Sequence, residues 1–443
     1  MRRAPRPPRA FAPWLTVVLL ATACQPAASV APRSPSAPFA AADERPNILL
    51  IIADDFGIDT SPCYAGADKP AMPNLQSLCD EGVVFDTVWV NPQCTPTRAT
   101  ILTGQYGFRT GVRQRDEELD DTPSIHDLLG KQPAPYANAV IGKWHLGGDA
   151  PDLDHPATFG IHHYAGFLAG ELGDYFDWTA IDGDTAVRST VYATTWMTDR
   201  AIDWVGAQTD EPWFLWLAYN APHSPYHLPP AELHQQPGLG GTPPEIRENP
   251  RPYYLAMAEA MDAEIGRLLQ SMPDAVRDNT TVMFIGDNGT PDEVLPPGSA
   301  LGHSRGTVYE GGVRVPLVVA GHGVTRRGER EDSLVNGTDL FATIARLSGH
   351  PDTNINDGMS FEEALTDPNF TGRTHLFTEF PGVWAVRDLR YKLIQHESGE
   401  LQLFDLQTDP LETQDLWESS PGPDVAAVAE ALQTYQQDLQ AGP

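Results

Sequence analysis

The sequence predicts a doubly wound α/β domain followed by a small antiparallel sheet. Continuous apolar runs recur along the chain and end in polar residues, which is typical of strands buried on both faces of a parallel sheet. Segments with helical spacing of apolar residues alternate with these runs. After about residue 372 this alternation ends, and short strand-like segments joined by turn residues follow.

Composition limits the functions that such a protein can have. The chain has 443 residues, 41% of them hydrophobic, which is enough for a sizeable core and excludes a disordered chain. Its 60 Asp and Glu against 29 Lys and Arg give a formal charge of −31. Such an acidic field repels nucleic acid and anionic membranes, so we expect no nucleic-acid partner and a local cationic pocket for any anionic substrate.

The amino terminus is predicted to be a targeting segment. Four arginines precede the apolar stretch 14–23, which is too short to span a bilayer and fits a signal peptide over residues 1–23. We therefore expect an exported protein, either periplasmic or lipid-anchored at the bacterial cell envelope. The segment before Cys24 resembles a lipoprotein cleavage box, so lipidation of Cys24 and simple cleavage both stay open. Residues 24–45, rich in Ala, Pro and Ser, are expected to form a linker.

Three further cysteines follow in the main domain. Cys63 and Cys79 are 16 positions apart and either form a disulfide in an oxidising compartment or remain buried thiols. Cys94 is then the odd cysteine, and its neighbours indicate a different role.

Two apolar runs end in pairs of oxygen-bearing side chains. These are Asp54 and Asp55 after residues 47–53, and Asp287 and Asn288 after residues 281–286. Oxygen ligands alone suit a hard cation, Ca²⁺ or Mg²⁺, and Ca²⁺ is the preferred occupant. Three carboxylates held close together also repel one another, which favours a bound metal.

Other runs end in basic and polar side chains. Residues 139–142 lead to Lys143 and His145, residues 213–219 lead to Asn220 and His223, and residues 313–320 are a further predicted strand. Helical spacing is found at 257–269 and 338–347. One Asp after a strand is more often a cap or turn residue, but four endings with complementary chemistry indicate a site. We expect them to converge beyond the carboxyl ends of the strands.

Cys94 precedes a predicted helix. Thr95 is expected to cap a helix that starts at Pro96, with Arg98 one turn in, so Cys94 lies at a helix amino terminus. This position predicts a thiolate nucleophile with a lowered pKa. A soft thiolate beside a hard cation is a chemical mismatch, which implies that Cys94 is modified.

The motifs resemble those of the type I sulfatase family, in the alkaline-phosphatase-like superfamily. Cys94-Thr-Pro-Thr-Arg98 matches its Cys-x-Pro-x-Arg signature. Further matches are Asp54-Asp55, Gly142 to Gly147, Ala221 to His223, Asp287 to Gly289, Arg305 to Pro316 and Leu403 to Glu412. The resemblance covers most of residues 46–415. It implies a large mixed, mostly parallel sheet sandwiched by helices in a catalytic domain, residues 46–371, and a carboxyl-terminal subdomain, residues 372–443.

The resemblance also implies a modified nucleophile and a metal. Cys94 would be oxidised to formylglycine by a maturation enzyme, and the hydrated aldehyde is an oxygen nucleophile compatible with Ca²⁺. One Ca²⁺ ion would be held by Asp54, Asp55, Asp287, Asn288 and the modified Cys94.

The remaining residues implied by the resemblance handle the ester. Arg98 would hold the formylglycine hydrate, one hydroxyl of which attacks sulfur, while His223 gives a proton to the leaving alcohol or phenol. His145 would take part in expelling sulfate, and Lys143 would stabilise charge on the sulfuryl oxygens. Arg305 is a further expected sulfate contact. The family commonly has Lys at that position, so a planar fork replaces a compact ammonium.

The sequence leaves the leaving group open. A sulfated carbohydrate is the preferred substrate because export brings the enzyme to polysaccharide fragments, and an aryl sulfate fits the same chemistry. Two variable loops, 148–184 and 227–252, are expected to set specificity. Tyr175, Phe176 and Trp178 in the first loop either stack on a sugar or aryl group or pack beneath the loop.

Two other functions remain as alternatives. One is a phosphodiester or phosphonate monoester hydrolase of the same superfamily, although these enzymes typically have His where this chain has Asn288. The other is a non-catalytic glycan-binding lipoprotein. His126, next to a helix start, is expected to be structural. The carboxyl-terminal region is predicted to have strands at 375–380, 383–386, 391–395 and 401–405 and a helix at 425–439.

Overall fold

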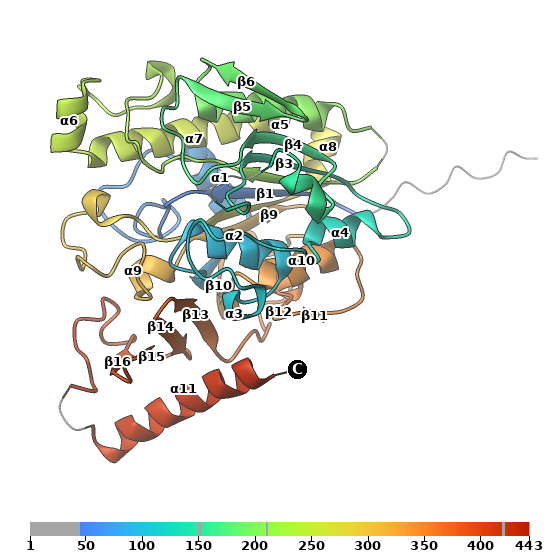
Figure 1. The fold of residues 1–443 in the computed structure, drawn as a ribbon. Helices are drawn as coiled ribbons and strands as arrows, with labels where there is room; N and C mark the ends of the chain where they lie inside the picture. Colours follow the sequence, from blue (N-terminus) through green and yellow to red (C-terminus); the bar gives the residue numbers. More distant parts are fainter. Residues whose placement is uncertain (1–44, 149–151, 210, 419–420, 443) are drawn as a thin grey trace, which may run out of the picture. The chain divides into compact units, whose positions relative to one another are not determined.

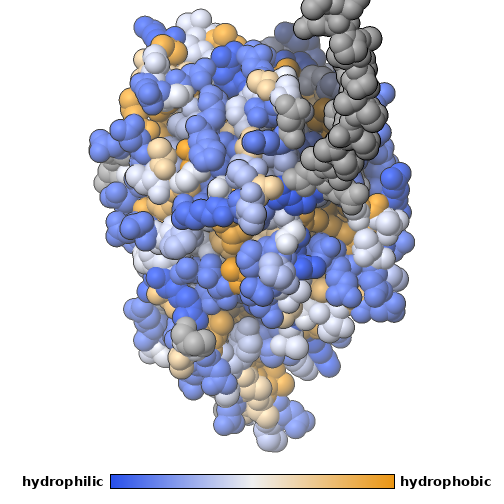
Figure 2. All heavy atoms as spheres, turned by 90° about the vertical axis from the view of Figure 1, so that its right-hand side faces the viewer, coloured by the Kyte–Doolittle hydropathy of each residue, from blue (hydrophilic) through white to orange (hydrophobic). Residues whose placement is uncertain are grey.

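The computed structural model describes residues 45–148, 152–209, 211–418 and 421–442. The predicted signal peptide, the Cys24 lipidation site and nearly all of the linker lie outside the described residues. Among the described residues, no helix is both long enough and apolar enough to cross a bilayer. Figure 2 shows one face of the molecule, on which hydrophilic side chains dominate and apolar ones form small patches.

The main sheet has ten strands in the order β10-β2-β9-β8-β1-β7-β3-β4-β5-β6. They are β1 (Asn47–Ala53), β2 (Val83–Trp89), β3 (Ala137–Lys143), β4 (His163–Phe167), β5 (Trp178–Asp182), β6 (Thr185–Ser189), β7 (Trp213–Ala218), β8 (Thr280–Gly286), β9 (Leu317–Gly321) and β10 (Glu329–Asn336). Neighbours from β8 through β1, β7 and β3 to β4 run parallel, as do β2 and β10. The other neighbouring pairs are antiparallel. The predicted mixed, mostly parallel sheet is confirmed.

Helices cover both faces of this sheet (Figure 1). One face packs against α1 (Pro73–Glu81), α5 (Ala193–Gly206) and α7 (Arg251–Ser271), and the other against α2 (Cys94–Thr103), α4 (Ile125–Gly130) and α10 (Asp339–Leu347). Side chains of β1 alternate between the two cores: Ile48, Leu50 and Ile52 on one side, Leu49 and Ile51 on the other. A strand buried on both faces needs apolar residues at every position, which explains the uninterrupted run.

Short helices occupy the connections. They are α3 (Gly107–Thr110), α6 (Pro243–Glu248), α8 (Asp274–Asp278) and α9 (Glu310–Val313), with 3₁₀ segments η1 (His155–Phe159), η2 (Ala231–Leu233), η3 (Asp292–Val294) and η4 (Glu362–Leu365). A two-stranded pair, β11 (Asn354–Ile355) and β12 (Gly358–Met359), precedes η4.

The predicted strand at 313–320 is wrong in its first part. Val313 ends the helical turn α9, in which the Arg314 amide donates to the Glu310 carbonyl at 2.8 Å. The strand β9 begins only at Leu317. An isolated bridge joins Arg314 to Trp89, but Pro316 has no amide hydrogen to give to a sheet ladder, so the continuous strand begins after it.

The carboxyl-terminal region forms the predicted antiparallel sheet and helix. The elements are β13 (Leu376–Phe380), β14 (Val383–Arg387), β15 (Tyr391–His396), β16 (Leu401–Asp405) and α11 (Pro423–Ala441). One face of this sheet packs on Leu432 of α11, and the other packs on Trp89 and Leu334 at the edge of the main sheet. The described residues belong to one compact unit, and the domain boundary at 371/372 stays a prediction.

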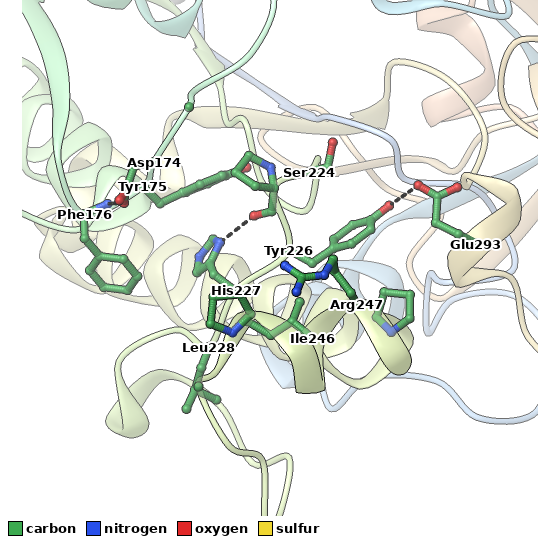
Figure 3. Close-up of a pocket in the computed structure, with 15 residues that line it drawn as sticks. Asp174, Tyr175, Phe176, Ser224, Tyr226, His227, Leu228, Ile246, Arg247 and Glu293 are labelled. Atoms are coloured by element: carbon green, nitrogen blue, oxygen red, sulfur yellow. Dashed lines mark hydrogen bonds between the residues drawn. The ribbon is translucent and has the colours of Figure 1, made fainter.

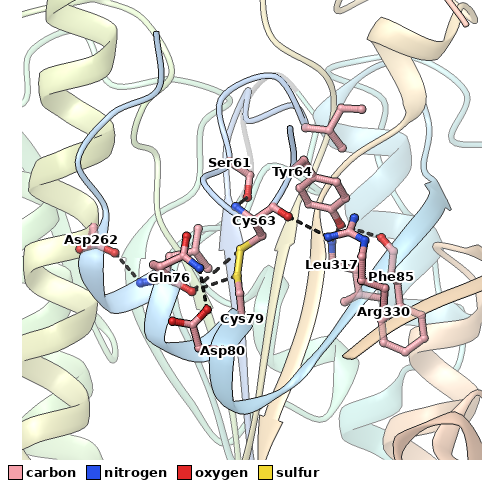
Figure 4. Close-up of a disulfide and its surroundings, with 12 residues drawn as sticks. Ser61, Cys63, Tyr64, Gln76, Cys79, Asp80, Phe85, Asp262, Leu317 and Arg330 are labelled. Carbon is pink, nitrogen blue, oxygen red and sulfur yellow. Dashed lines mark hydrogen bonds between the residues drawn. A yellow bond between two sulfur atoms is a disulfide. The ribbon is translucent and has the colours of Figure 1, made fainter. Parts of the chain in front are cut away.

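Cys63 and Cys79 form a disulfide (Figure 4), with 6.0 Å between their Cα atoms. The bond ties the loop after β1 to helix α1. Of the two alternatives open from the sequence, the structure therefore has the bridge. Cys94 is buried and is not part of a disulfide.

Candidate active site

Four neighbouring parallel strands deliver polar side chains to one edge of the main sheet. Ala53, the last residue of β1, is level with Gly286, the last residue of β8. On the other side, Ile52 is level with Ala218 at the end of β7, which in turn pairs with Gly142 of β3. Residues that follow these strands therefore start from a common edge, as parallel pairing predicts.

The acidic residues lie against one another at this edge. Asp54, Asp55, Asp287 and Asn288 are fully buried. The Asp55 amide donates to Asp287 Oδ1 at 3.2 Å, and Asn288 Nδ2 donates to Asp55 Oδ1 at 2.7 Å. Asp55 adopts φ 62°, a left-handed conformation that Asp tolerates better than most residues and that turns the chain directly after β1.

This cluster fits a hard cation. Ligand atoms of Asp54, Cys94 and Asp287 lie within 4.8 Å of one another, and so do those of Asp54, Asp55 and His223. Within the described part of the chain, Asp54 Oδ1 and Asn288 Oδ1 are buried oxygens without a hydrogen-bond donor. Because an unpaired buried acceptor is costly, these two oxygens indicate a missing positive partner. Carboxylate and amide oxygens are the ligands that Ca²⁺ prefers.

Two buried cations neutralise part of this charge. Lys143 Nζ lies 2.5 Å from Asp54 Oδ2, and Arg98 Nη2 lies 2.8 Å from Asp287 Oδ2, all in fully buried side chains. Burial alone would raise the pKa of Asp54, but the positive charge of Lys143 and its neighbours lowers it well below its usual range. Burial and the negative charge of Asp54 raise the pKa of Asp287 to about 6. Arg305 pairs with Asp55, so three cations face the three carboxylates. The unpartnered oxygens of Asp54 and Asn288, rather than an excess of negative charge, therefore support a bound cation.

Cys94 is the first residue of α2, not the residue before its cap. Gln93 is the N-cap, without a side-chain cap bond, so the prediction that Thr95 caps a helix from Pro96 is wrong. Thr95 Oγ1 instead contacts His145 Nε2 at 3.1 Å. The predicted lowering of the thiol pKa is also wrong: burial raises the pKa of Cys94, and the charge of Asp54 adds to this effect.

His145 is held by a residue that sequence reasoning missed. Its Nε2 lies 2.8 Å from Asp116 Oδ1. Since a carboxylate only accepts hydrogen bonds, Nε2 carries the hydrogen and Nδ1 is the unprotonated nitrogen. Burial, followed by the charge of Lys143, lowers the pKa of His145 to about 3. A Cβ on Gly170 would stand 2.4 Å from His145 Nε2, so this glycine is needed for the close approach.

Arg305 and His223 complete the site from two other loops. Arg305 Nη2 lies 3.8 Å from Cys94 Sγ and 3.4 Å from His223 Nε2, and its Nε forms an ion pair with Asp55. His223 Nδ1 is 2.6 Å from the Ser224 carbonyl, which only accepts, so Nδ1 carries a hydrogen and Nε2 is left to act in the site.

These side chains surround a hollow of about 140 Å³. Its walls are Cys94, Arg115, Asp116, His145, Ala169, Gly170, Glu171, His223 and Arg305. All site residues expected from the sequence, Asp54, Asp55, Cys94, Arg98, Lys143, His145, His223, Asp287, Asn288 and Arg305, lie in or directly beneath it. This placement is observed, whereas their catalytic and metal-binding roles stay predictions.

The three aromatic residues expected to set specificity differ in exposure. Tyr175 and Trp178, the first residue of β5, are buried, as the packing alternative predicts, whereas Phe176 is 38% exposed and its stacking on a substrate ring stays a prediction. His126 is fully buried, with its ring 4.9 Å from that of Phe214, well within the core as expected for a structural residue.

Comparisons with known proteins agree with this arrangement. A family model described as Sulfatase matches residues 46–350, and one described as N-sulphoglucosamine sulphohydrolase, C-terminal, matches residues 303–441. N-acetylgalactosamine-6-sulfatase of Sus scrofa is 28% identical over 380 residues, covering 75% of this chain and 68% of the relative. The uncharacterized sulfatase YdeN of Escherichia coli (strain K12) is 27% identical over 424 residues, which cover 80% of this chain and 74% of the relative.

Solved structures share the fold. Ps i-CgsB, solved in complex with k-i-k-neocarrahexaose, aligns with a TM-score of 0.74 at 25% identity, covering 89% of this chain and 92% of that chain. BT4656, solved in complex with its substrate D-glucosamine-2-N,6-O-disulfate, aligns with a TM-score of 0.72 at 22% identity. The alignment covers 90% of this chain and 98% of that chain.

Proposed function

Because this chain belongs to the sulfatase family and is therefore a sulfuric ester hydrolase, we propose that its substrate is a sulfated carbohydrate. The observation that carries the proposal is the meeting of Cys94, His223 and Arg305 around one small hollow above the acidic cluster. A nucleophile position, a proton donor and an anion-binding fork are what sulfuryl transfer requires. Two similar proteins support a carbohydrate substrate: the relative from Sus scrofa is named N-acetylgalactosamine-6-sulfatase, and Ps i-CgsB was solved in complex with k-i-k-neocarrahexaose.

We infer that Cys94 acts as formylglycine and that one Ca²⁺ ion is held by Asp54, Asp55, Asp287 and Asn288. The hydrated aldehyde would supply an oxygen nucleophile, and the cation would supply positive charge for the sulfuryl oxygens. The unpartnered oxygens of Asp54 and Asn288 support the metal. The cluster of hard oxygen ligands around Cys94 supports a nucleophilic oxygen in place of sulfur.

The protein's own side chains then bind and orient the ester. Lys143 and Arg305 bring positive charge to the sulfuryl group, and Arg98 fixes Asp287 while its Nη1 holds the Lys143 carbonyl at 2.9 Å. His223 acts as the imidazolium: its Nδ1 hydrogen stays on the Ser224 carbonyl, and its Nε2 hydrogen passes to the leaving oxygen, which leaves the ring neutral. His145, whose Nε2 hydrogen is held by Asp116, keeps an unprotonated Nδ1, and we assign this ring a part in sulfate release.

We also propose that the protein is exported. The targeting segment expected over residues 1–23 and the disulfide between Cys63 and Cys79 both support this, because disulfides persist in oxidising compartments.

The test is sulfate release from sulfated sugars and from 4-nitrophenyl sulfate by protein produced with a formylglycine-generating enzyme. Mass spectrometry of the peptide containing residue 94 establishes whether the aldehyde is present. The Cys94→Ala variant should release no sulfate. Unchanged release by that variant, or faster hydrolysis of phosphodiesters or phosphonate monoesters by the same preparation, would overturn the proposal.

A further inference from the structure

A second and larger cleft lies beside the site (Figure 3), with a volume of about 840 Å³. One wall is the loop between β4 and β5, through Asp174 to Phe176. The other is the chain after β7, through Ser224 to Leu228, and helix α6 together with Glu293 of η3 closes the far end. Parts of the two loops expected to set specificity line this cleft, and none of the residues assigned to the reaction does.

The cleft and the catalytic hollow share their walls. Ala169 to Glu171 and His223 line the hollow, and the same two segments continue as Gly173 to Phe176 and Ser224 to Leu228 along the cleft. Tyr175 fastens them together, because its hydroxyl lies 2.7 Å from the His223 carbonyl and 2.8 Å from the Asn220 carbonyl. His223 is the residue that we place at the leaving oxygen. The rest of a large leaving group therefore extends from the His223 side, where the cleft lies.

Aromatic side chains provide flat apolar surface in this cleft. Phe176 is 38% exposed, and its ring is stacked on Tyr192 with 5.0 Å between centroids, so it is held in place. Tyr226 is half-buried and is fixed by its hydroxyl, 3.2 Å from Glu293 Oε1, and by the Tyr254 ring. The C–H faces of a sugar ring pack well on such rigid aromatic surfaces.

Arg247 provides the positive charge. It is the only Lys or Arg among the residues that line the cleft, it is exposed, and it forms no hydrogen bond or ion pair with any residue that the structure describes. His227 does not add charge at neutral pH, since burial lowers its pKa to about 4. Two carboxylates also line the cleft, but Asp174 accepts from the Phe176 amide at 2.7 Å and Glu293 from the Tyr226 hydroxyl at 3.2 Å. Arg247 is paired with neither, so its guanidinium is available to an anionic ligand.

We propose that this cleft binds the leaving-group side of an acidic oligosaccharide. A sugar ring next to the sulfated one packs against Phe176 and Tyr226, and an anionic substituent of that part of the chain, a carboxylate or a second sulfate, binds Arg247. This inference rests on the proposed function and narrows it: the substrate is an oligosaccharide with at least one anionic group beyond the ester that is cleaved.

The experiment compares Arg247→Ala, Arg247→Lys and Phe176→Ala with the unsubstituted enzyme in its formylglycine form. Arg277→Ala is the matched control, since Arg277 is exposed on α8, pairs only within its own helix and does not line the cleft. 4-Nitrophenyl sulfate has an uncharged leaving group and therefore offers no anion to Arg247. The acidic probes are chondroitin 6-sulfate and heparin tetrasaccharides with their carboxyl-reduced forms, measured as substrates and as competitive inhibitors of 4-nitrophenyl sulfate hydrolysis.

The proposal predicts inhibition or turnover by at least one acidic tetrasaccharide. For that probe, Arg247→Ala should raise KM or Ki about 10-fold, in line with the loss of one hydrogen bond to a charged group, and Arg247→Lys should restore part of it. Turnover of 4-nitrophenyl sulfate, whose leaving group carries no anion, should change no more in the two Arg247 variants than in Arg277→Ala. Phe176→Ala should raise KM or Ki for the same tetrasaccharide. If the effect of Arg247→Ala vanishes with the carboxyl-reduced probe, the anion is the carboxylate; if it persists, the anion is a second sulfate.

Three results would overturn the proposal. They are an acidic tetrasaccharide panel that neither inhibits nor is hydrolysed, an Arg247→Ala effect no larger than that of Arg277→Ala, and an equal loss on 4-nitrophenyl sulfate. In each of these cases sulfate release from a sulfated sugar without a second anionic group, by the unsubstituted enzyme, still establishes the proposed function. Failure of the cleft is therefore distinguished from failure of the proposed function.

Discussion

The Arg305 guanidinium contacts the Cys94 sulfur, with 3.8 Å between Nη2 and Sγ. The same nitrogen lies 3.4 Å from His223 Nε2, while Nε pairs with Asp55. One planar group therefore links the nucleophile position, the proton donor and the acidic cluster. A lysine ammonium is a single point of charge, whereas the guanidinium fork has separate donors for these neighbours.

Substitution of Arg305 should separate charge from geometry. We expect Arg305→Gln to lower kcat/KM for 4-nitrophenyl sulfate about 10²-fold or more, as for the loss of a preorganised oxyanion donor. Arg305→Lys keeps the charge but loses the fork, and should lose only about 10-fold. Arg277→Gln serves as the control for a surface arginine. Equal losses in the Gln and Lys variants would show that the fork, not the charge, matters.

Removal of divalent cations should lower both activity and Tm. The oxygen cluster of Asp54, Asp287 and Asn288 is buried with unpartnered acceptors, so a cation that binds only the folded chain stabilises it. At about 100 times Kd, this stabilisation is roughly 2.7 kcal/mol. Tm measured after chelation and after adding back Ca²⁺ or Mg²⁺ tests this. Asn288→Ala should abolish most of the rise in Tm that Ca²⁺ produces. If Ca²⁺ changes the Tm of neither protein, the proposed metal site is wrong.

Asp116 is expected to act by positioning His145. Asp116→Ala removes the acceptor 2.8 Å from His145 Nε2 and should lower kcat about 10-fold, as the loss of an outer partner of an active-site histidine does elsewhere. Asp116→Asn keeps an acceptor oxygen and should retain more activity. The Tm and the kcat–pH profile are measured together, with exposed Asp120→Ala as control. A fall in Tm without a change in the pH profile would indicate a merely structural role.

The disulfide should contribute measurably to stability. Its cysteines are 16 positions apart, and closing a loop of that length restricts the unfolded chain by roughly 3 kcal/mol. The double variant Cys63→Ser with Cys79→Ser should therefore unfold at a lower denaturant concentration, while Cys94 remains available for modification. Reductant should shift the midpoint of the unsubstituted protein toward that of the variant and leave the variant unmoved. If both proteins, each with and without reductant, unfold at the same denaturant concentration, the disulfide does not contribute to stability.

Acid should destabilise the fold through His126. Burial lowers the pKa of His126 from 6.5 to about 3, so the folded chain holds it neutral where the unfolded chain binds a proton. The neutral ring therefore makes its full contribution to the free energy of unfolding above pH 6.5 and loses it as the pH falls toward 3. Over this range the free energy of unfolding falls by at most ~1.4 kcal/mol per pH unit. The free energy of unfolding is measured against pH for the unsubstituted protein and for His126→Phe, and the difference between the two should change with this slope. If the two curves run parallel, His126 is not the group responsible.

The elements of the main sheet were readable from the sequence because burial on both faces leaves an uninterrupted apolar run. The predicted run 47–53 is β1, and the predicted helix 338–347 differs from α10 by one residue. The boundary at Pro316 was missed because an apolar run does not reveal where a continuous sheet ladder begins. The start of α2 was missed for a related reason: Thr95 has the chemistry of a cap, but tertiary contacts with His145 occupy its hydroxyl.

Asp116 illustrates what local pattern cannot supply. It stands in the charged segment Arg115 to Glu118, which is typical of a solvated surface. Only the folded chain brings it to His145, 29 positions away. The pKa of Cys94 was likewise misjudged, because a helix terminus and a nearby arginine are visible in sequence while complete burial is not.

The sequence by itself determined the fold class, the sulfatase family and the set of groups available for catalysis, because each of these is written in short motifs and in the period of apolar residues. Tertiary structure decided which of those groups touch, which are buried, and where a cleft opens beside them. Such contacts join positions as far apart as Asp55 and Asn288, and their strength depends on distance and desolvation, which no local stretch of chain encodes.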